Sequence, residues 1–307
     1  MDPEQSSLPH IEKIFRDFDL QDERRRKGFR AFFNSQSNTL HILLFILTFA
    51  STFFTAYLMH GNSVSGGLWF SSGIMSILLA HEMGHYLMCR KYRVAATLPY
   101  FIPFPILNPF GTFGAIIRMD GRIPSRKILF DIGAGGPYAG LIVTLPALYF
   151  GISWSTIVEI QTQSSGGFIT LGESFLFKTI SWLAIGELPA GYDIVLHPLG
   201  FAGWAGLFVT ALNLLPVGQL DGGHVIYALM GRRSRYVYPV TLGMFILLSI
   251  WFFKGWALMA ILLLVFGQEH PPTTDKETPL DRTRIGLALF VLLIFFLSFA
   301  PVPITVS

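Results

Sequence analysis

The chain has 307 residues, of which 52% are hydrophobic and only 13% are charged. Soluble domains carry about 25% charged residues, so this composition, with its long apolar blocks, excludes an ordinary soluble domain and indicates a chain surrounded by lipid. The formal net charge of +3 indicates little by itself, and we expect no nucleic-acid partner. Cys89 is the only cysteine, so an internal disulfide is excluded.

The first 37 residues are polar and mixed in charge. A secretory signal has an early apolar stretch, and transit peptides contain few acidic residues. We therefore expect residues 1–37 to be a cytoplasmic segment of a protein from a prokaryotic cell membrane. Residues 10–33 alternate apolar and charged positions, which predicts an amphipathic helix on the membrane surface. A short soluble helix or a disordered tail is the alternative.

Long apolar runs follow and predict membrane-spanning helices. They cover residues 40–59, 68–89, 132–150, 198–215, 237–253, 256–267 and 285–300. Residues 97–118 are also apolar but contain four prolines, which one regular helix cannot accommodate. We expect a re-entrant hairpin there, shielded by protein because lipid cannot satisfy its backbone groups. The predicted fold is an all-α polytopic membrane protein of about six to seven transmembrane segments, in one domain at residues 38–303.

The positions of the basic residues test this arrangement, because cytoplasmic loops of membrane proteins carry an excess of Lys and Arg. We place the N-terminus in the cytoplasm and let residues 97–118 enter and leave on one side. Only Lys178 and Lys254 of the 22 Lys and Arg then fall on the outer side. This asymmetry favours a multi-pass protein with a cytoplasmic N-terminus.

A His-Glu-x-x-His pattern, His81-Glu82-Met83-Gly84-His85, lies near the inner end of the second predicted span. Histidines at positions i and i+4 lie on nearly the same face of a helix, which suits two imidazole ligands of one tetrahedral zinc ion. Glu82 lies beside them as a candidate general base for an attacking water. Such a short pattern can arise by chance, but ionisable groups inside an apolar span are costly and usually functional.

A hydrolytic zinc site needs three protein ligands and one open position. Asp221 is the candidate third ligand, because it follows an apolar run that ends at the same predicted depth as the histidine pair. His224 is an alternative ligand three residues further on. D-G-G is also a turn signal, so Asp221 could instead mark a turn that ends a helix.

Two motifs together resemble the site-2 protease family of intramembrane zinc metalloproteases: H-E-M-G-H at residues 81–85 and N-L-L-P-V-G-Q-L-D-G-G at residues 213–223. The family's second pattern, Asn-x-x-Pro-x-x-x-x-Asp-Gly, is matched by Asn213, Pro216, Asp221 and Gly222. Further stretches, G-T-F-G-A-I-I-R-M and L-F-D-I-G-A-G-G-P-Y-A-G, are similar to the compact branch without a PDZ domain, which includes plant chloroplast members. The resemblance spans about residues 68–270.

The resemblance implies that His81, His85 and Asp221 bind one zinc ion and that Glu82 is the catalytic base. It also implies that Asn213 lies near the scissile bond, where it orients the substrate or stabilises the oxyanion. The alternative role of Asn213 is an interhelical hydrogen bond that only holds spans together.

Three other features have expected roles. Pro216 would kink or end the fourth span beside the metal. Residues 97–118 either offer an edge, at residues 112–117, to which an unwound substrate adds as a strand, or only shield the zinc from lipid. The glycines of the third span are expected to permit close helix packing. They are Gly133, Gly135, Gly136 and Gly140.

These patterns predict a zinc-dependent membrane endopeptidase that cleaves within or near transmembrane segments of membrane-protein substrates in a lipid bilayer. One alternative is a polytopic transporter or metal carrier, because broken spans and buried ionisable groups are transporter traits too. A second alternative is an inactive zinc-binding scaffold of the same family. The sequence predicts neither the identity of a substrate nor an oligomeric state.

Overall fold

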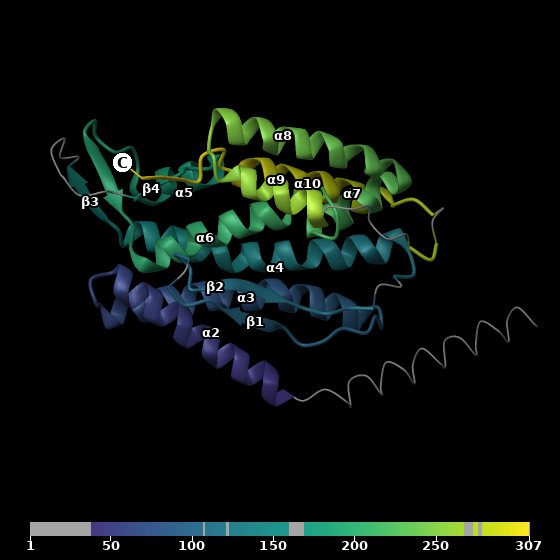
Figure 1. Cartoon of the computed structure of the whole chain (residues 1–307), viewed down its shortest axis with the longest axis horizontal. Coiled ribbons are helices and arrows are strands. Elements are labelled where there is room, and N and C mark those ends of the chain that lie inside the picture. The colour runs from purple at the N-terminus through teal and green to yellow at the C-terminus, as the bar shows by residue number, and fades with distance from the viewer. Residues whose placement is uncertain are drawn as a thin grey trace, which may run out of the picture.

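The computed structural model describes residues 38–106, 108–120, 123–159, 169–266, 273–275 and 278–306. The amphipathic helix predicted at residues 10–33 lies outside the described residues. The described part is mostly helical, and its helices run along a common long axis (Figure 1). The helices are α2 (Asn38–Met59), α3 (Val64–Lys91), α4 (Arg126–Ser153), α5 (Phe175–Ile185), α6 (Pro198–Asn213), α7 (Asp221–Met230), α8 (Val237–Trp251), α9 (Trp256–Phe266) and α10 (Arg282–Ser298), with a 3-10 helix, η2 (Gly231–Tyr236), between α7 and α8.

Every predicted span coincides with a helix, but the helices differ in length. Helices α2, α3 and α4 are long and apolar enough to cross a membrane. Helices α6, α8 and α10 have 16, 15 and 17 residues. At about 1.5 Å per residue, each is shorter than a hydrocarbon core of roughly 30 Å. Length and composition therefore support crossing for three of the predicted spans.

Side-chain caps explain where several of these helices begin. A Ser precedes α3, α4 and α5, and in each case its side-chain oxygen accepts a hydrogen bond from a backbone N–H in the first turn. Asp281 does the same for α10. Such a cap satisfies one of the backbone donors that a helix leaves unpaired at its start.

The described residues also form three two-stranded antiparallel ladders, so the expectation of an all-α chain is incomplete. Strand β1 (Tyr100–Pro103) pairs with β2 (Thr112–Ile116) inside the Pro-rich stretch, where an extended hairpin was expected. Strand β3 (Thr156–Glu159) pairs with β5 (Tyr192–Val195), and β4 (Ile169–Leu171) pairs with β6 (Ile304–Val306). The last two ladders join segments far apart in sequence, and neither was predicted.

Helix α2 has a polar buried face and an apolar exposed one. Its buried residues include His41, Thr48, Ser51, Thr52 and Thr55, whereas residues such as Leu43 and Ile46 are exposed. The polar face contacts the backbone of the β1–β2 hairpin. The Ser51 hydroxyl donates to the carbonyl oxygen of Gly111 at 2.6 Å, and Thr55 Oγ1 accepts from the N–H of Ile106 at 3.2 Å. Side chains of α2 thus satisfy backbone groups that the hairpin leaves unpaired.

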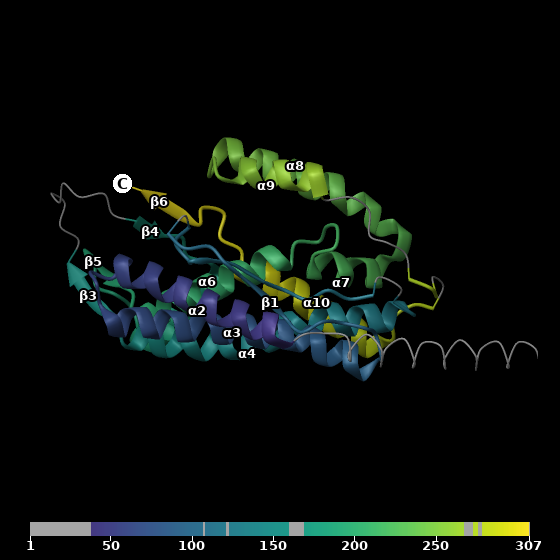
Figure 2. The ribbon, with the colours of Figure 1, turned by 60° about the horizontal axis from the view of Figure 1, so that its bottom comes forward.

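Helix α4 lies at the centre of the bundle and packs against α3, α6 and α7. Figure 2 shows the α8–α9 pair on the other side of α7 and α10 from α4. One hydrophobic cluster joins these elements through buried residues such as Phe130 of α4, Val225 of α7, Phe245 of α8 and Val291 of α10. The close contact of α3, α4 and α7 brings their polar residues together.

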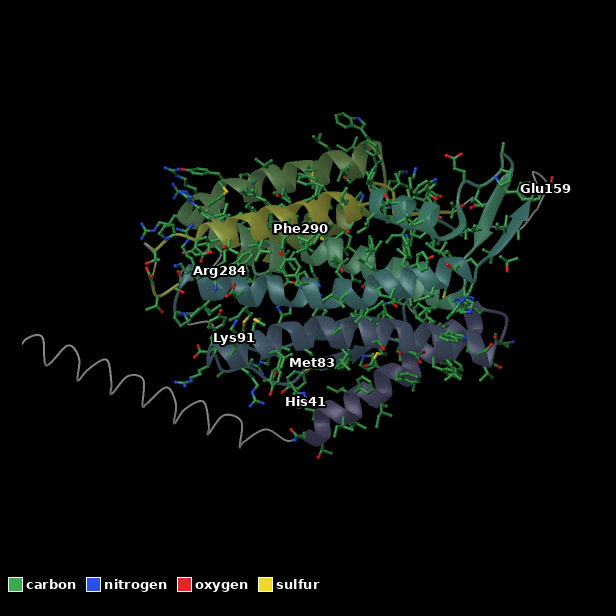
Figure 3. The ribbon with its side chains drawn as sticks, turned by 180° about the vertical axis from the view of Figure 1, so that it is seen from behind. His41, Met83, Lys91, Glu159, Arg284 and Phe290 are labelled. Atoms are coloured by element: carbon green, nitrogen blue, oxygen red, sulfur yellow. The ribbon has the colours of Figure 1, made fainter. Side chains whose placement is uncertain are left out.

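The two ends of the bundle differ in charge, as the basic-residue pattern predicts. Figure 3 shows Lys91 and Arg284 at one end and Glu159 at the opposite end. Met83, inside the His-Glu-x-x-His motif, lies between these ends and nearer to Lys91. The motif therefore lies closer to the basic end.

Candidate metal centre

Two histidines from α3 and one aspartate from α7 converge on one point. His81 Nε2 and His85 Nε2 are 3.1 Å apart. His81 Nε2 lies 3.1 Å from Asp221 Oδ2, and His85 Nε2 lies 3.2 Å from Asp221 Oδ1. The three side chains are 7%, 7% and 13% exposed. Residues separated by more than 130 positions in the chain thus form one buried cluster of ligating atoms that could hold a metal ion.

The chemistry of this cluster fits zinc. Four ligands placed tetrahedrally at about 2.0–2.2 Å from zinc lie roughly 3.3–3.6 Å from one another. The three observed separations, 3.1–3.2 Å, are close to that spacing. Two imidazoles and one carboxylate also match a common donor set of hydrolytic zinc sites, in which the fourth position is left for water or substrate.

A compact turn between α6 and α7 places Asp221 at the cluster. Helix α6 ends at Asn213, before Pro216, and α7 begins at Asp221. A Cβ on Gly222 would lie 2.0 Å from the carbonyl oxygen of Leu214, so the turn folds too closely against α7 for a side chain there. Asp221 is the first residue of α7, where the positive end of the helix dipole favours its carboxylate. The alternative, in which Asp221 marks a turn that ends a helix, is wrong.

The far end of α7 is held by Arg126, the first residue of α4. Arg126 Nε donates to the carbonyl oxygen of Ala228 at 2.8 Å, and its Nη2 donates to that of Leu229 at 2.6 Å. These are terminal carbonyls of α7, which lack partners within the helix. Arg126 is buried, so α7, and with it Asp221, is fixed against α4.

Helix α4 also forms the wall behind the two histidines. His85 Nδ1 lies 2.8 Å from the carbonyl oxygen of Ile132. A hydrogen bond there leaves Nε2 free to face the ligand cluster, as metal-binding histidines usually require. A Cβ on Gly136 would lie 2.0 Å from His85 Nε2, and one on Gly140 would lie 3.2 Å from His81 Nδ1. These two glycines make room for the imidazoles, a more specific role than the helix packing predicted for them.

Gly136→Ala is expected to displace the His85 ring and to weaken zinc binding by at least about 10-fold, the low end of losses seen when a ligand's surroundings are altered. The measurement is zinc affinity by competition with a chelator. The matched control is Gly286→Ala in α10, because no atom lies within 4 Å of the added Cβ. Equal zinc affinity of Gly136→Ala and the unsubstituted chain would contradict the assigned role of Gly136.

Glu82 and Asn213 both lie at the cluster without belonging to the ligand set. Glu82 is 7% exposed, and the backbone N–H of Ile117, just after β2, lies near its carboxylate. Asn213 is the last residue of α6, and its side-chain nitrogen lies 3.4 Å from His81 Nε2. The candidate base is thus in contact with the hairpin, a link that no sequence pattern indicated.

His224, the alternative ligand, is buried on α7 but is not part of the ligand cluster. Its Cβ lies 2.7 Å from the position that a Cβ on Gly133 would take, so it packs against α4. His197, at the start of α6, packs against the rings of Trp69 and Trp154, with centroids 5.7 Å and 5.6 Å away. The cluster brings together the three predicted ligands and neither of these other histidines.

Comparison with known proteins places the chain in a family. The model of peptidase family M50 matches residues 69–253, more than half of the chain. The chain is 30% identical over 249 residues to "Probable zinc metalloprotease EGY1, chloroplastic" of Arabidopsis thaliana, an alignment that covers 78% of this chain and 44% of that protein. It is also 30% identical over 233 residues to "Probable zinc metalloprotease EGY2, chloroplastic" of the same plant, covering 74% of this chain and 40% of the relative. The chain thus spans less than half the length of these curated relatives. The family model, together with the convergent His81, His85 and Asp221, establishes that this chain belongs to peptidase family M50.

Proposed function

We propose that this chain is a zinc-dependent membrane endopeptidase that hydrolyses peptide bonds within or near transmembrane segments of membrane-protein substrates. The observation that carries the proposal is the buried convergence of His81, His85 and Asp221, with Glu82 beside them. Both plant relatives described above carry the words zinc metalloprotease in their names. A transporter would need no carboxylate next to the ligand set, and no contact in the described residues favours that alternative.

In this proposal His81, His85 and Asp221 would hold one zinc ion, which would act as a Lewis acid toward the scissile carbonyl and lower the pKa of the attacking water. The Glu82 carboxylate takes a proton from that water as its oxygen bonds to the carbonyl carbon. Glu82 then gives the proton to the amine nitrogen as the carbon–nitrogen bond breaks. In the same proposal Asn213, at the end of α6, donates a hydrogen bond to the carbonyl oxygen as its charge develops.

We further propose that α6, α8, α9 and α10 lie in the membrane with α2, α3 and α4, and that the β1–β2 hairpin re-enters it from the basic side. Backbone groups in lipid must find partners inside the protein. The polar face of α2 supplies such partners through Ser51 and Thr55. A polar buried face on a helix with an apolar exposed surface is the arrangement expected where α2 separates the hairpin from lipid.

Cysteine labelling tests this orientation, because Cys89 is fully buried and gives little background. A membrane-impermeant maleimide is expected to label Arg233→Cys only from the cytoplasmic side and Glu159→Cys only from the opposite side. Phe113→Cys, on an exposed hairpin position, is expected to stay unlabelled in intact membranes and to react in detergent. Labelling of Arg233→Cys and Glu159→Cys from the same side would contradict the orientation, and labelling of Phe113→Cys in intact membranes would contradict re-entry.

The hairpin has two proposed roles, to bind an unwound substrate as an added strand or to shield the metal centre from lipid. The proximity of the Ile117 backbone to Glu82 supports the first role, because a strand held along β2 would lie beside the base. A photo-reactive group at Phe113 separates the two roles. Crosslinks to a bound substrate support strand addition, whereas crosslinks to lipid alone support shielding.

The experiment that tests the proposed activity is cleavage of a model transmembrane substrate by the full chain in a lipid bilayer, with zinc counted on the same preparation. Cleavage with about one zinc per chain supports an active peptidase. Stoichiometric zinc without cleavage of any transmembrane substrate supports the inactive scaffold instead.

A prokaryotic cell membrane with residues 1–37 in the cytoplasm remains the predicted location, and the domain at residues 38–303 remains the predicted protease unit.

A further inference from the structure

We propose that Asp131 is a positioning residue for the metal centre. Through Tyr92 and Arg284, it fixes the contact between α3 and α4 at which His85 presents Nε2 to the ligand cluster. The inference rests on the proposed function, since it takes the cluster to be a zinc site. None of these three residues belongs to the ligand set or to the motifs that the sequence singled out for catalysis.

Three helices meet at the Asp131 carboxylate. Arg284, in the first turn of α10, donates from Nε to Asp131 Oδ1 at 2.8 Å and from Nη2 to Oδ2 at 2.6 Å. Tyr92, the residue that caps the end of α3, donates its hydroxyl to Oδ2. Asp281 holds Arg284 from the other side, accepting from Nη1 at 2.5 Å. A two-point Arg–carboxylate pair is both strong and geometrically specific.

This network lies next to the hydrogen bond that orients His85. Tyr92 follows His85 by seven residues, about two helical turns, so both side chains lie on the same face of α3. On α4, Asp131 directly precedes Ile132, whose carbonyl oxygen lies 2.8 Å from His85 Nδ1. Helix α3 is therefore tied to one turn of α4 at two points: Tyr92 with Asp131, and His85 with Ile132.

The packing between these helices leaves little room for a shift. A Cβ on Gly84 would lie 2.3 Å from the carbonyl oxygen of Gly135, so α3 and α4 are in backbone contact beside His85. The Asp131–Arg284 pair is also largely shielded, with side chains 15% and 27% exposed. A change at Asp131 that lets α4 turn or slide would thus move the Ile132 carbonyl relative to the His85 ring.

Outer partners that orient a metal-binding histidine typically contribute 10–100-fold to metal affinity. Asp131 acts one step further out, through the Ile132 carbonyl, so about 10-fold is the expected contribution. A purely structural role predicts something else: a loss of stability in the metal-free protein with no selective change in zinc affinity.

Tyr138 provides a matched control. Its hydroxyl donates to the carbonyl oxygen of Leu287 at 2.8 Å and so ties α4 to α10, the two helices that Asp131 and Arg284 also join. Tyr138→Phe removes a link between these helices without touching Tyr92 or Ile132. This variant shows whether a change in zinc affinity comes from loosened packing of α10 against α4 or from a displaced His85 ring.

The test compares zinc affinity, by chelator competition, and thermal stability without metal for the full chain in lipid nanodiscs. Asp131→Asn is expected to bind zinc about 10-fold more weakly, and Tyr138→Phe to stay within about 2-fold of the unsubstituted chain. Equal zinc affinity of a folded Asp131→Asn protein overturns the inference. An equal loss in Tyr138→Phe overturns it too, because the effect then belongs to helix docking.

Two milder variants decide the matter if Asp131→Asn does not fold. Tyr92→Phe removes one donor, and Arg284→Lys keeps the charge but loses the two-point geometry. Both are expected to weaken zinc binding measurably, and unchanged affinity in both overturns the inference. If the unsubstituted chain binds no zinc, the proposed function fails and this inference with it. If that chain binds zinc and the variants bind it equally well, only the inference fails.

Discussion

Glu82→Gln is expected to lower peptide-bond cleavage by about 10²–10⁴-fold, the range that a positioned general acid–base group contributes. The amide keeps the size of the side chain but cannot take a proton from water. Because Glu82 lies outside the ligand cluster, zinc content should stay unchanged. The measurement is the initial rate of cleavage of a model transmembrane substrate in a bilayer, with zinc counted on the same samples.

Glu173→Gln is the matched control for this variant. Glu173 is an exposed carboxylate that pairs with Lys178 at 3.3 Å, away from the cluster, so the same chemical change there should leave cleavage intact. If Glu82→Gln cleaves as fast as the unsubstituted chain, Glu82 is not the base. A metal flux that survives Glu82→Gln, with no cleavage by the unsubstituted chain, would instead favour the transporter alternative.

Asp221→Ala is expected to weaken zinc binding by more than about 100-fold and to abolish cleavage. Outer-sphere partners alone contribute 10–100-fold, and Asp221 supplies one of three ligands. The loss leaves two imidazoles, and a hydrolytic zinc site needs three protein ligands. The measurements are zinc affinity by chelator competition and the rate of cleavage of the same transmembrane substrate.

His224→Ala is the control, since it removes the alternative ligand on the same helix and keeps the Cβ that packs beside Gly133. It is expected to retain zinc. The opposite pattern, with zinc lost in His224→Ala and kept in Asp221→Ala, would show that α7 presents a different ligand from the one in this structure.

The ligand set could be predicted from sequence because each part has a local signature. His81 and His85 are placed on one face by helical spacing alone. Predicted depth indicates Asp221, because the span before it ends at the same membrane level as the histidine pair. The uneven distribution of basic residues among the loops predicts that both sites lie near the cytoplasmic ends of their spans. The structure brings these residues together.

Features that depend on contacts between distant segments were not predicted. Helix α7 was not predicted, because D-G-G is also a turn signal, and only the fold of residues 214–220 against it explains Gly222 and Gly223. The β3–β5 and β4–β6 ladders join strands of three or four residues, too short for a periodic signal. Gly133, Gly136 and Gly140 did carry a usable signal, since spacings of three and four place them on one face of a helix.

The polar face of α2 is also visible in the sequence. Its Thr and Ser residues recur at helical spacing within an apolar span, and polar groups at membrane depth require partners. The structure supplies such partners for Ser51 and Thr55 in the backbone of Gly111 and Ile106. A polar stripe on a spanning helix thus indicates that the element packed against it offers hydrogen-bonding groups.

Zinc-edge X-ray absorption of the purified, unsubstituted chain tests the central claim most directly. The account predicts about one zinc per chain, with two imidazole nitrogens and a carboxylate oxygen at about 2.0–2.2 Å. A zinc ion bound only by surface histidines, or one whose spectrum lacks the signature of two imidazoles, would contradict it.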